Sequence, residues 1–242
     1  MDFSELSHQR EIRESLNKIF SEKCSPEKLK NFDNEFKHDE NLYEFLATNG
    51  YLGLGINEKL SGSGEDLYDL GILFECLGFH AAPLCLTGCL VDVAQTLQKF
   101  SKNDNHQSIV SSITKGEIYT SAILEPLNHD PENPTTTAVF DDDKIIISGT
   151  KYLSEISSLA KGILISASSN KGVILALVKT DNVKLTQLTS TANSPLFKVE
   201  LKNVSIEESD VVHEEGRGLE ALKYLLQINM VMRSYIALGV TN

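Results

Sequence analysis

The sequence has little of the composition that marks non-globular or disulfide-built proteins. Its 242 residues include 15 glycines, 6 prolines and 4 cysteines, which excludes a collagen-like chain, a disordered chain and a disulfide scaffold. The cysteines form no CxxC pair, so a reducing, cytoplasmic compartment is expected. No stretch approaches the roughly 20 apolar residues of a membrane span. The acidic start, Met1 to Glu5, also lacks the features of a signal or transit peptide.

Basic residues are outnumbered by acidic ones, 22 to 34, and the formal net charge is -12. No run of lysine and arginine is dense enough to follow a phosphate backbone, so nucleic acid is not an expected partner, and membrane insertion is not expected either. The six histidines show no spacing of the HxxxH kind, so no metal site is predicted. With 41% hydrophobic residues, a chain of this length can bury a core without a metal or a disulfide.

Helical periodicity dominates the first part of the chain. Gly50 is typical of a helix stop, and a further short helix is predicted before Gly116. The sequence therefore predicts an N-terminal helical domain over residues 1–115. The apolar positions that share predicted helical faces are Phe3, Leu6, Ile12, Leu16 and Ile19, then Leu42, Phe45 and Leu46, then Leu67, Leu70, Phe74 and Leu77, then Leu84, Leu86, Leu90, Val93 and Leu97.

From Gly116 onward the period becomes strand-like. Asp141 to Asp143 favours a hairpin turn, and the helical period returns after Gly216-Arg217-Gly218. The prediction is an α+β chain, with a middle β-domain over residues 116–215, barrel-like or a sandwich, and one helix over 216–242. The β-rich runs are Ile118–Leu124, Thr136–Phe140, Ile145–Ile147, Ile163–Ile165, Val173–Val178 and Phe197–Leu201.

The predicted last helix carries apolar residues on several faces, among them Leu222, Val231 and Ile236, and no element follows that could cover them. A single helix cannot bury its own apolar faces. We therefore expect that it docks on a partner chain, or that it is the first helix of an incomplete C-terminal bundle.

Several short motifs occur together in one order. They are Gly50-Tyr51-Leu52-Gly53 with Ser61-Gly62-Ser63-Gly64, then Glu75 with Gly78, Leu124-Glu125-Pro126, Gly149-Thr150-Lys151, and Gly216-Arg217-Gly218 followed by Arg233. This series resembles the acyl-CoA dehydrogenase family, in the order of its GxxG, GGxG, EExG, T-E-P, G-x-K and G-x-G…R motifs. The resemblance covers essentially the whole chain.

The resemblance implies a fold and an activity. The fold is an N-terminal helical domain, a middle β-domain and a C-terminal four-helix bundle. The activity is FAD-dependent α,β-desaturation of an acyl thioester, carried by CoA or an acyl-carrier group, within a homo- or hetero-oligomer. That reaction needs a glutamate base, a flavin over the reacting carbons, and donors to the thioester carbonyl.

The catalytic base is missing at the positions that the resemblance points to. In most family members it lies in the bundle, beyond the last residue of this sequence. In a minority it immediately precedes the arginine that matches Arg233, where this chain has Met232, which accepts no proton. No catalytic residue is therefore assigned, and we expect a partner chain to supply the base.

The flavin site implied by the resemblance maps onto two segments. The family's T-E-P-x-x-G-S-D corresponds to a segment in which Leu124 and Asp130 replace two hydroxyl residues around Glu125. The family's W-I-[ST] corresponds to Leu153-Ser154-Glu155, which lacks the stacking aromatic. These six residues, Leu124, Glu125, Asp130, Leu153, Ser154 and Glu155, are the cofactor-contact candidates.

Simpler structural interpretations accompany these assignments. Ser61 to Gly64 is typical of a tight turn, since no P-loop Lys-Ser/Thr follows it. Glu125 with Pro126 suits a strand end at a bulge, and Glu155 suits a solvated surface charge. Arg233, on an otherwise apolar helix, predicts a structural ion pair.

Three hypotheses about function remain open. The chain is a subunit of a hetero-oligomeric acyl-CoA dehydrogenase whose partner supplies the glutamate. Alternatively, it is a non-catalytic scaffold that binds an acyl-CoA, an acyl-carrier group or a protein. In the third, it is a remnant without activity of its own.

Overall fold

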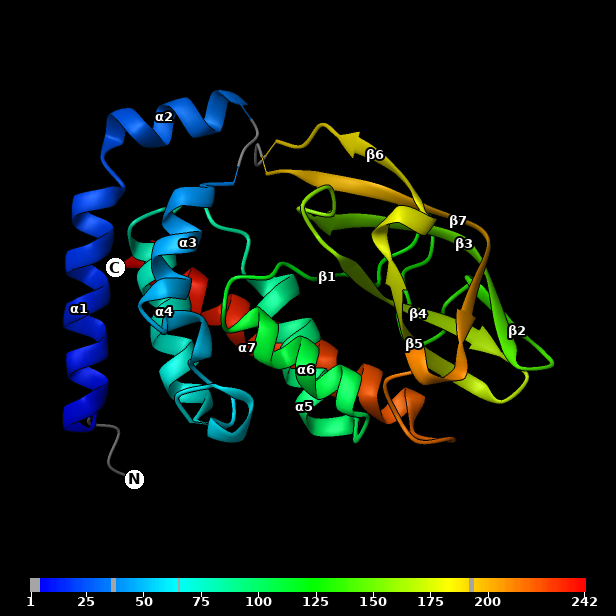
Figure 1. Ribbon diagram of the computed structural model, residues 1–242. Helices are drawn as coiled ribbons and strands as arrows, with labels where there is room; N and C mark the ends of the chain where they lie inside the picture. Colours follow the sequence, from blue (N-terminus) through cyan, green and yellow to red (C-terminus); the bar gives the residue numbers. More distant parts are fainter. Residues whose placement is uncertain (1–4, 36–37, 65, 192–193) are drawn as a thin grey trace.

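Helices, a sheet and a final long helix follow one another along the chain, as the sequence predicts (Figure 1). The computed structural model describes residues 5–35, 38–64, 66–191 and 194–242. Phe3 of the predicted first helical face lies outside these residues. None of the described helices is both long and apolar enough to cross a membrane.

The helical part is built from short helices with polar caps. Asp39 and Asp66 each cap a helix by accepting a backbone N–H, from Leu42 at 3.0 Å and from Tyr68 at 2.8 Å. The helices are α1 (Ser7–Lys23), α2 (Pro26–Glu35), α3 (Glu40–Thr48), α4 (Leu67–Phe79), the π-helix η3 (Thr87–Gln95), α5 (Thr96–Phe100) and α6 (Asp104–Ile113). The described residues also form the 3-10 turns η1 (Tyr51–Gly53), η2 (Glu58–Leu60), η4 (Thr180–Asn182) and η5 (Glu208–Asp210).

The middle part is one curled sheet, so the barrel-like alternative is correct and the sandwich is not. Its strands are β1 (Thr120–Ala122), β2 (Thr137–Asp141), β3 (Lys144–Glu155), β4 (Gly162–Ser169), β5 (Gly172–Lys179), β6 (Lys184–Leu188) and β7 (Leu196–Glu207). The spatial order is β1-β4-β2-β3-β7-β6, and β5 pairs with β4. β4 runs parallel to β1 and β2, whereas the other pairs are antiparallel.

Strands β4 and β5 separate two hydrophobic cores. Leu164, Leu175 and Leu177 face the helices, whereas the alternate residues Ile165 and Ala176 face the inside of the curled sheet. Both faces of these strands are therefore buried, which explains their nearly continuous apolar sequence. The sheet is fixed to the helical part through this shared layer.

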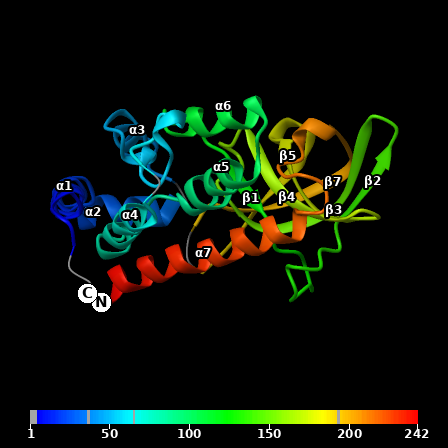
Figure 2. The ribbon, with the colours of Figure 1, turned by 90° about the horizontal axis from the view of Figure 1, so that it is seen from below.

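The last helix, α7 (Gly218–Thr241), packs with one face on α4 and η3, which precede it in the chain (Figure 2). Three glycines permit a close approach to α4. A Cβ on Gly78 would lie 2.2 Å from the carbonyl oxygen of Ile236, and one on Gly239 would lie 2.0 Å from that of Glu75. A Cβ on Gly71 would meet the ring of Tyr235 at 2.5 Å. Side-chain volume at Gly78 or Gly239 would separate the helices, because it would meet backbone atoms of the facing helix.

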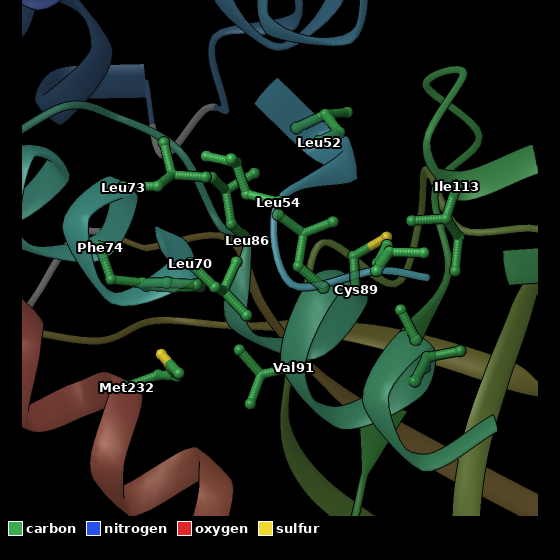
Figure 3. Close-up of a cluster of buried hydrophobic side chains, with 14 of the residues drawn as sticks. Leu52, Leu54, Leu70, Leu73, Phe74, Leu86, Cys89, Val91, Ile113 and Met232 are labelled. Atoms are coloured by element: carbon green, nitrogen blue, oxygen red, sulfur yellow. The ribbon is translucent and has the colours of Figure 1, made fainter. Parts of the chain in front are cut away.

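Only one face of α7 is covered in this way. Leu222, Leu225 and Met232 are buried, and Met232 projects into the cluster that contains Leu70 and Phe74 of α4 (Figure 3). Its outer face exposes Met230, Val231, Leu238 and Val240.

Candidate functional site

A cavity of about 390 Å³ lies between the edge of the sheet and α7. Its polar residues are Asp92, Ser121, Tyr152, Glu155, Ser194, Asn229 and Arg233, and its apolar residues are Ile123, Leu124, Leu153, Leu196, Leu225 and Leu226. They come from η3, β1, β3, β7, α7 and the segments beside them. The cavity is thus built from parts of the chain that are far apart in sequence.

An irregularity in β3 shapes one wall of this cavity. The pairing of β3 with β7 shifts register between Lys151 and Ser154. Leu153 adopts a positive φ of 58° there and is 49% exposed. Because a bulge turns side chains out of the regular alternation, Tyr152 and Leu153 both line the cavity.

Hydrogen bonds run continuously from the sheet across the cavity to α7. Ser121 Oγ donates to Asp92 Oδ2 at 2.5 Å, and Asn229 Nδ2 donates to Asp92 Oδ1 at 2.7 Å. Arg233 Nε donates to Asn229 Oδ1 at 2.8 Å, and its Nη2 donates to Glu155 Oε1 at 3.3 Å. The five side chains connect β1, η3, α7 and β3.

Asp92 is an acid in an almost fully buried position. Burial raises the pKa of its carboxyl to about 7, although the hydrogen bonds from Asn229 and Ser121 act in the opposite direction. The carboxyl therefore changes protonation state near neutral pH. It lies in η3, and π-helical turns of this kind often accompany functional sites.

Glu155 and Arg233 form the ion pair that the sequence predicts for Arg233. Their side chains are 19% and 56% exposed. The second carboxylate oxygen of Glu155, Oε2, is buried and has no hydrogen-bond partner among the described residues. Glu155 is therefore neither the fully solvated charge of the simpler interpretation nor a fully satisfied ion pair.

A second, fully buried ion pair stands behind the cavity. Lys151 Nζ lies 2.7 Å from Glu125 Oε1, and the two side chains are 0% and 1% exposed. Lys151 also donates to Ser166 Oγ at 3.0 Å and to the carbonyl oxygen of Ile123 at 3.3 Å. Burial lowers the pKa of Lys151 to about 8, against the opposing effect of Glu125.

Glu125 anchors the loop that joins β1 to β2. Burial acts to raise the pKa of its carboxyl, but the hydrogen bonds that it accepts hold that pKa well below its usual range. The donors are Lys151 Nζ, Asn128 Nδ2, the backbone N–H and hydroxyl of Thr135, and the backbone N–H of Thr136. Each carboxylate oxygen is thus satisfied, and the residue acts in the structure as an anchor.

The structure brings together only some of the six candidate residues. Leu124, Leu153 and Glu155 line the cavity. Ser154 is buried behind them, where its Oγ donates to the carbonyl oxygen of Ser121 at 2.7 Å. Glu125 is held in the buried ion pair.

Asp130 lies apart from the cavity, in an exposed loop. Its carboxylate accepts the backbone N–H of Glu132 at 3.1 Å and Nδ2 of Asn133 at 2.6 Å. The carboxylate therefore stabilises its own turn.

The lining of the cavity does not fit the isoalloxazine of FAD. The polar edge of a flavin needs hydrogen-bond donors, and its phosphates need donors or cations. The donors of Ser121 and Asn229 are directed at Asp92, and Nη2 of Arg233 is directed at Glu155. The cavity instead holds two acids, and leucines stand at 124 and 153. We therefore assign no step of a reaction to a flavin held here.

Sequence reasoning missed Asp92, Ser121 and Asn229 as members of the site. Asp92 and Asn229 are 137 positions apart, so no local pattern connects them. One signal was present for Asp92, because it is a lone acid in the apolar run Leu90 to Val93. Among the described residues, no cluster of three or more histidine, cysteine or acidic side chains could hold a metal ion.

The chain is similar in sequence to known proteins over part of its length. Residues 7–117 match the family model described as acyl-CoA dehydrogenase, N-terminal domain. The curated acyl-CoA dehydrogenase FadE28 of Mycobacterium tuberculosis is 23% identical over 170 residues, which cover 70% of this chain and 48% of FadE28. The chain thus matches about half the length of that relative.

Two solved structures share the fold over nearly the whole chain. The ChsE4-ChsE5 complex from Mycobacterium tuberculosis superposes with a TM-score of 0.90 at 21% identity, over 99% of this chain and 65% of that one. A variant of the Tcur3481-Tcur3483 steroid ACAD gives a TM-score of 0.87 at 25% identity, over 96% and 63%. Residues 7–117 therefore belong to the N-terminal domain family of acyl-CoA dehydrogenases, and the chain as a whole has the fold of these structures.

Proposed function

We propose that this chain is a subunit of a hetero-oligomeric acyl-CoA dehydrogenase in which another chain supplies the glutamate base and holds the flavin. The observation that carries the proposal is the position of Met232. This residue stands where some family members have their base, and it is fully buried in the core. That position on α7 thus has neither a proton acceptor nor access to the cavity.

The outer face of α7 supports a role in assembly. Met230, Val231, Leu238 and Val240 are exposed there along one helix. Apolar residues grouped on one exposed surface are typical of protein–protein contacts. Helices from another chain that pack against this face would complete a bundle of the kind expected from the resemblance.

Because the cavity lining does not suit FAD, we assign the desaturation step to residues of the partner chain. In the proposed assembly, FAD supplies hydride acceptance during α,β-desaturation of an acyl-CoA or acyl-carrier thioester. The residues of this chain do not take part in that step. The Glu125–Lys151 pair fixes the loop beside the cavity, and the outer face of α7 holds the partner.

Two of the structural neighbours support a heteromeric assembly by their descriptions. One is a complex of ChsE4 with ChsE5, and the other combines Tcur3481 with Tcur3483. Each description names two different chains together. We transfer that arrangement to this chain as part of the proposal.

Co-expression tests the proposal. The chain is produced with a full-length, glutamate-bearing acyl-CoA dehydrogenase chain from the same organism, and the mixture is separated by size-exclusion chromatography. We expect one complex that reduces a dye when acyl-CoA is added, whereas the chain alone does not. Val231→Glu combined with Val240→Glu on α7 should abolish the complex, and Lys144→Glu, at the exposed start of β3, should not. Failure of the wild-type chain to join any such complex would overturn the proposal.

A further inference from the structure

The cavity between the sheet and α7 has a charge pattern suited to a different ligand from the one its fold relatives suggest. Two carboxyl groups, Asp92 and Glu155, share it with one cation, Arg233. A thioester carbonyl offers only an acceptor, which gains nothing from the carboxylate of Glu155. A ligand with a positively charged donor group is complementary to this lining.

Glu155 is the group that such a ligand would contact. Its Oε1 already accepts from Arg233, but its Oε2 is buried and has no partner among the described residues. A buried acceptor without a donor is unfavourable. Because the terminal torsion of a glutamate is soft, the carboxylate can turn toward a donor in the cavity.

The apolar part of the lining is aliphatic, and Tyr152 lines the cavity beside it. Leu124 and Leu153 are the most exposed of the aliphatic residues, at 45% and 49%, and they lie at the cavity between β1 and the bulge of β3. Leu196, Leu225 and Leu226 contribute further wall from β7 and α7. A short alkyl chain would cover these side chains and remove them from water.

We propose that this cavity binds an aliphatic ammonium ion, with its alkyl part against the leucines and its ammonium group on Glu155. The proposal is independent of the assembly described above, because every group involved belongs to this chain. It also differs from the expected flavin, since the ligand carries donors and a positive charge.

Binding of a cation should be linked to the protonation of Asp92, which faces the cavity together with Glu155 from β3 and Arg233 from α7. Since burial raises the pKa of Asp92 to about 7, a neighbouring cation would favour its ionised form. Amine binding should therefore release protons near neutral pH, and affinity should rise as pH increases through 7. Asp92→Asn should remove this dependence.

Isothermal titration calorimetry of the purified chain tests the proposal with matched six-carbon probes. At neutral pH n-hexylamine is protonated, and we expect it to bind about ten-fold more tightly than n-hexanoate, with n-hexanol between them. Glu155→Gln should weaken hexylamine about ten-fold and strengthen hexanoate, because Arg233 is then free to pair with the carboxylate.

The control must account for general attraction of a cation to an acidic protein. Asp142→Asn, in the exposed turn between β2 and β3, changes the net charge as much as Glu155→Gln does. It should leave hexylamine binding within about two-fold of the wild type. Thermal unfolding confirms that both variants fold. The proposal is overturned if the wild type binds no hexylamine, if hexanoate binds as well, or if both variants weaken hexylamine equally.

Discussion

At Glu125, five donors converge on a single buried carboxylate, and one of them is a lysine that is itself fully buried. Such a pair contributes little when compared with apolar residues of the same shape, but removing one partner leaves the other charge uncompensated. The T-E-P-like and G-x-K-like motifs seen in the sequence thus meet as one structural clamp.

Lys151→Met should accordingly destabilise the fold by about 3–5 kcal/mol, because Glu125 keeps its charge and loses its cation. Lys102→Met is the matched control, since Lys102 pairs with Glu214 at 2.8 Å but both side chains are exposed. It should cost less than about 1 kcal/mol. Urea unfolding measures both values. Equal costs for the two variants would contradict a clamp at Glu125.

Asp92 should make stability depend on pH. Its folded pKa of about 7 lies above the unfolded value of about 3.9, so its contribution is fully present below about pH 4 and is lost as pH rises through 7. The free energy of unfolding of the wild type minus that of Asp92→Asn should therefore fall by up to about 4 kcal/mol between pH 4 and pH 8. Denaturant titrations at several pH values measure the difference. A difference independent of pH would show that Asp92 is not protonated in the folded state.

Short sequence motifs indicate only part of the cavity lining. Leu124, Leu153 and Glu155 were found because short motifs mark them, and all three line the cavity. Glu125 belongs to the same motif as Leu124, but its carboxylate pairs with Lys151 instead of lining the cavity. The sequence does not show this pairing, because the two residues meet only in the folded chain. Asp92 and Asn229 meet through the docking of α7 onto η3, which no local spacing encodes.

The close packing of α4 against α7, called the seam below, depends on glycine. The closest approaches are at Gly78 and Gly239, where an added Cβ would overlap a backbone carbonyl of the facing helix. Backbone atoms cannot move aside as a flexible side chain can. This seam holds the partly exposed α7 against the rest of the chain.

Gly78→Ala should force α7 away from α4 and lower the free energy of unfolding by about 1–3 kcal/mol or more. Ser234→Ala, on the exposed side of α7, should change it by less than about 0.5 kcal/mol. Chemical denaturation followed by circular dichroism compares the two variants. A Gly78→Ala chain as stable as the wild type would show that the seam is looser than described.

Strongly patterned elements were predictable, and weakly patterned ones were not. The runs at 163–165 and 173–178 lie inside β4 and β5, because buried strands keep an apolar sequence on both faces. β6 was missed because three of its five residues, Lys184, Thr186 and Gln187, are exposed. β3 was predicted only at 145–147, since its second half holds Gly149 and the buried Lys151.

In the molecule as a whole, α7 carries the apolar surface through which we expect the chain to contact other chains. It closes the cavity on one side and exposes apolar residues on the other. The sequence predicts a helix whose apolar faces require a packing partner. One of these faces is covered by α4 and η3 of the same chain. The uncovered face is the surface to which we assign the dehydrogenase partner.

We propose that this chain keeps the scaffold of an acyl-CoA dehydrogenase without holding the flavin itself. The visible absorption spectrum of the purified chain, alone and in complex with a glutamate-bearing partner, tests it most directly. We expect no flavin bands from the chain alone, even after addition of FAD, and flavin bands from the complex. Flavin bands from the chain alone would contradict the assignment of its cavity.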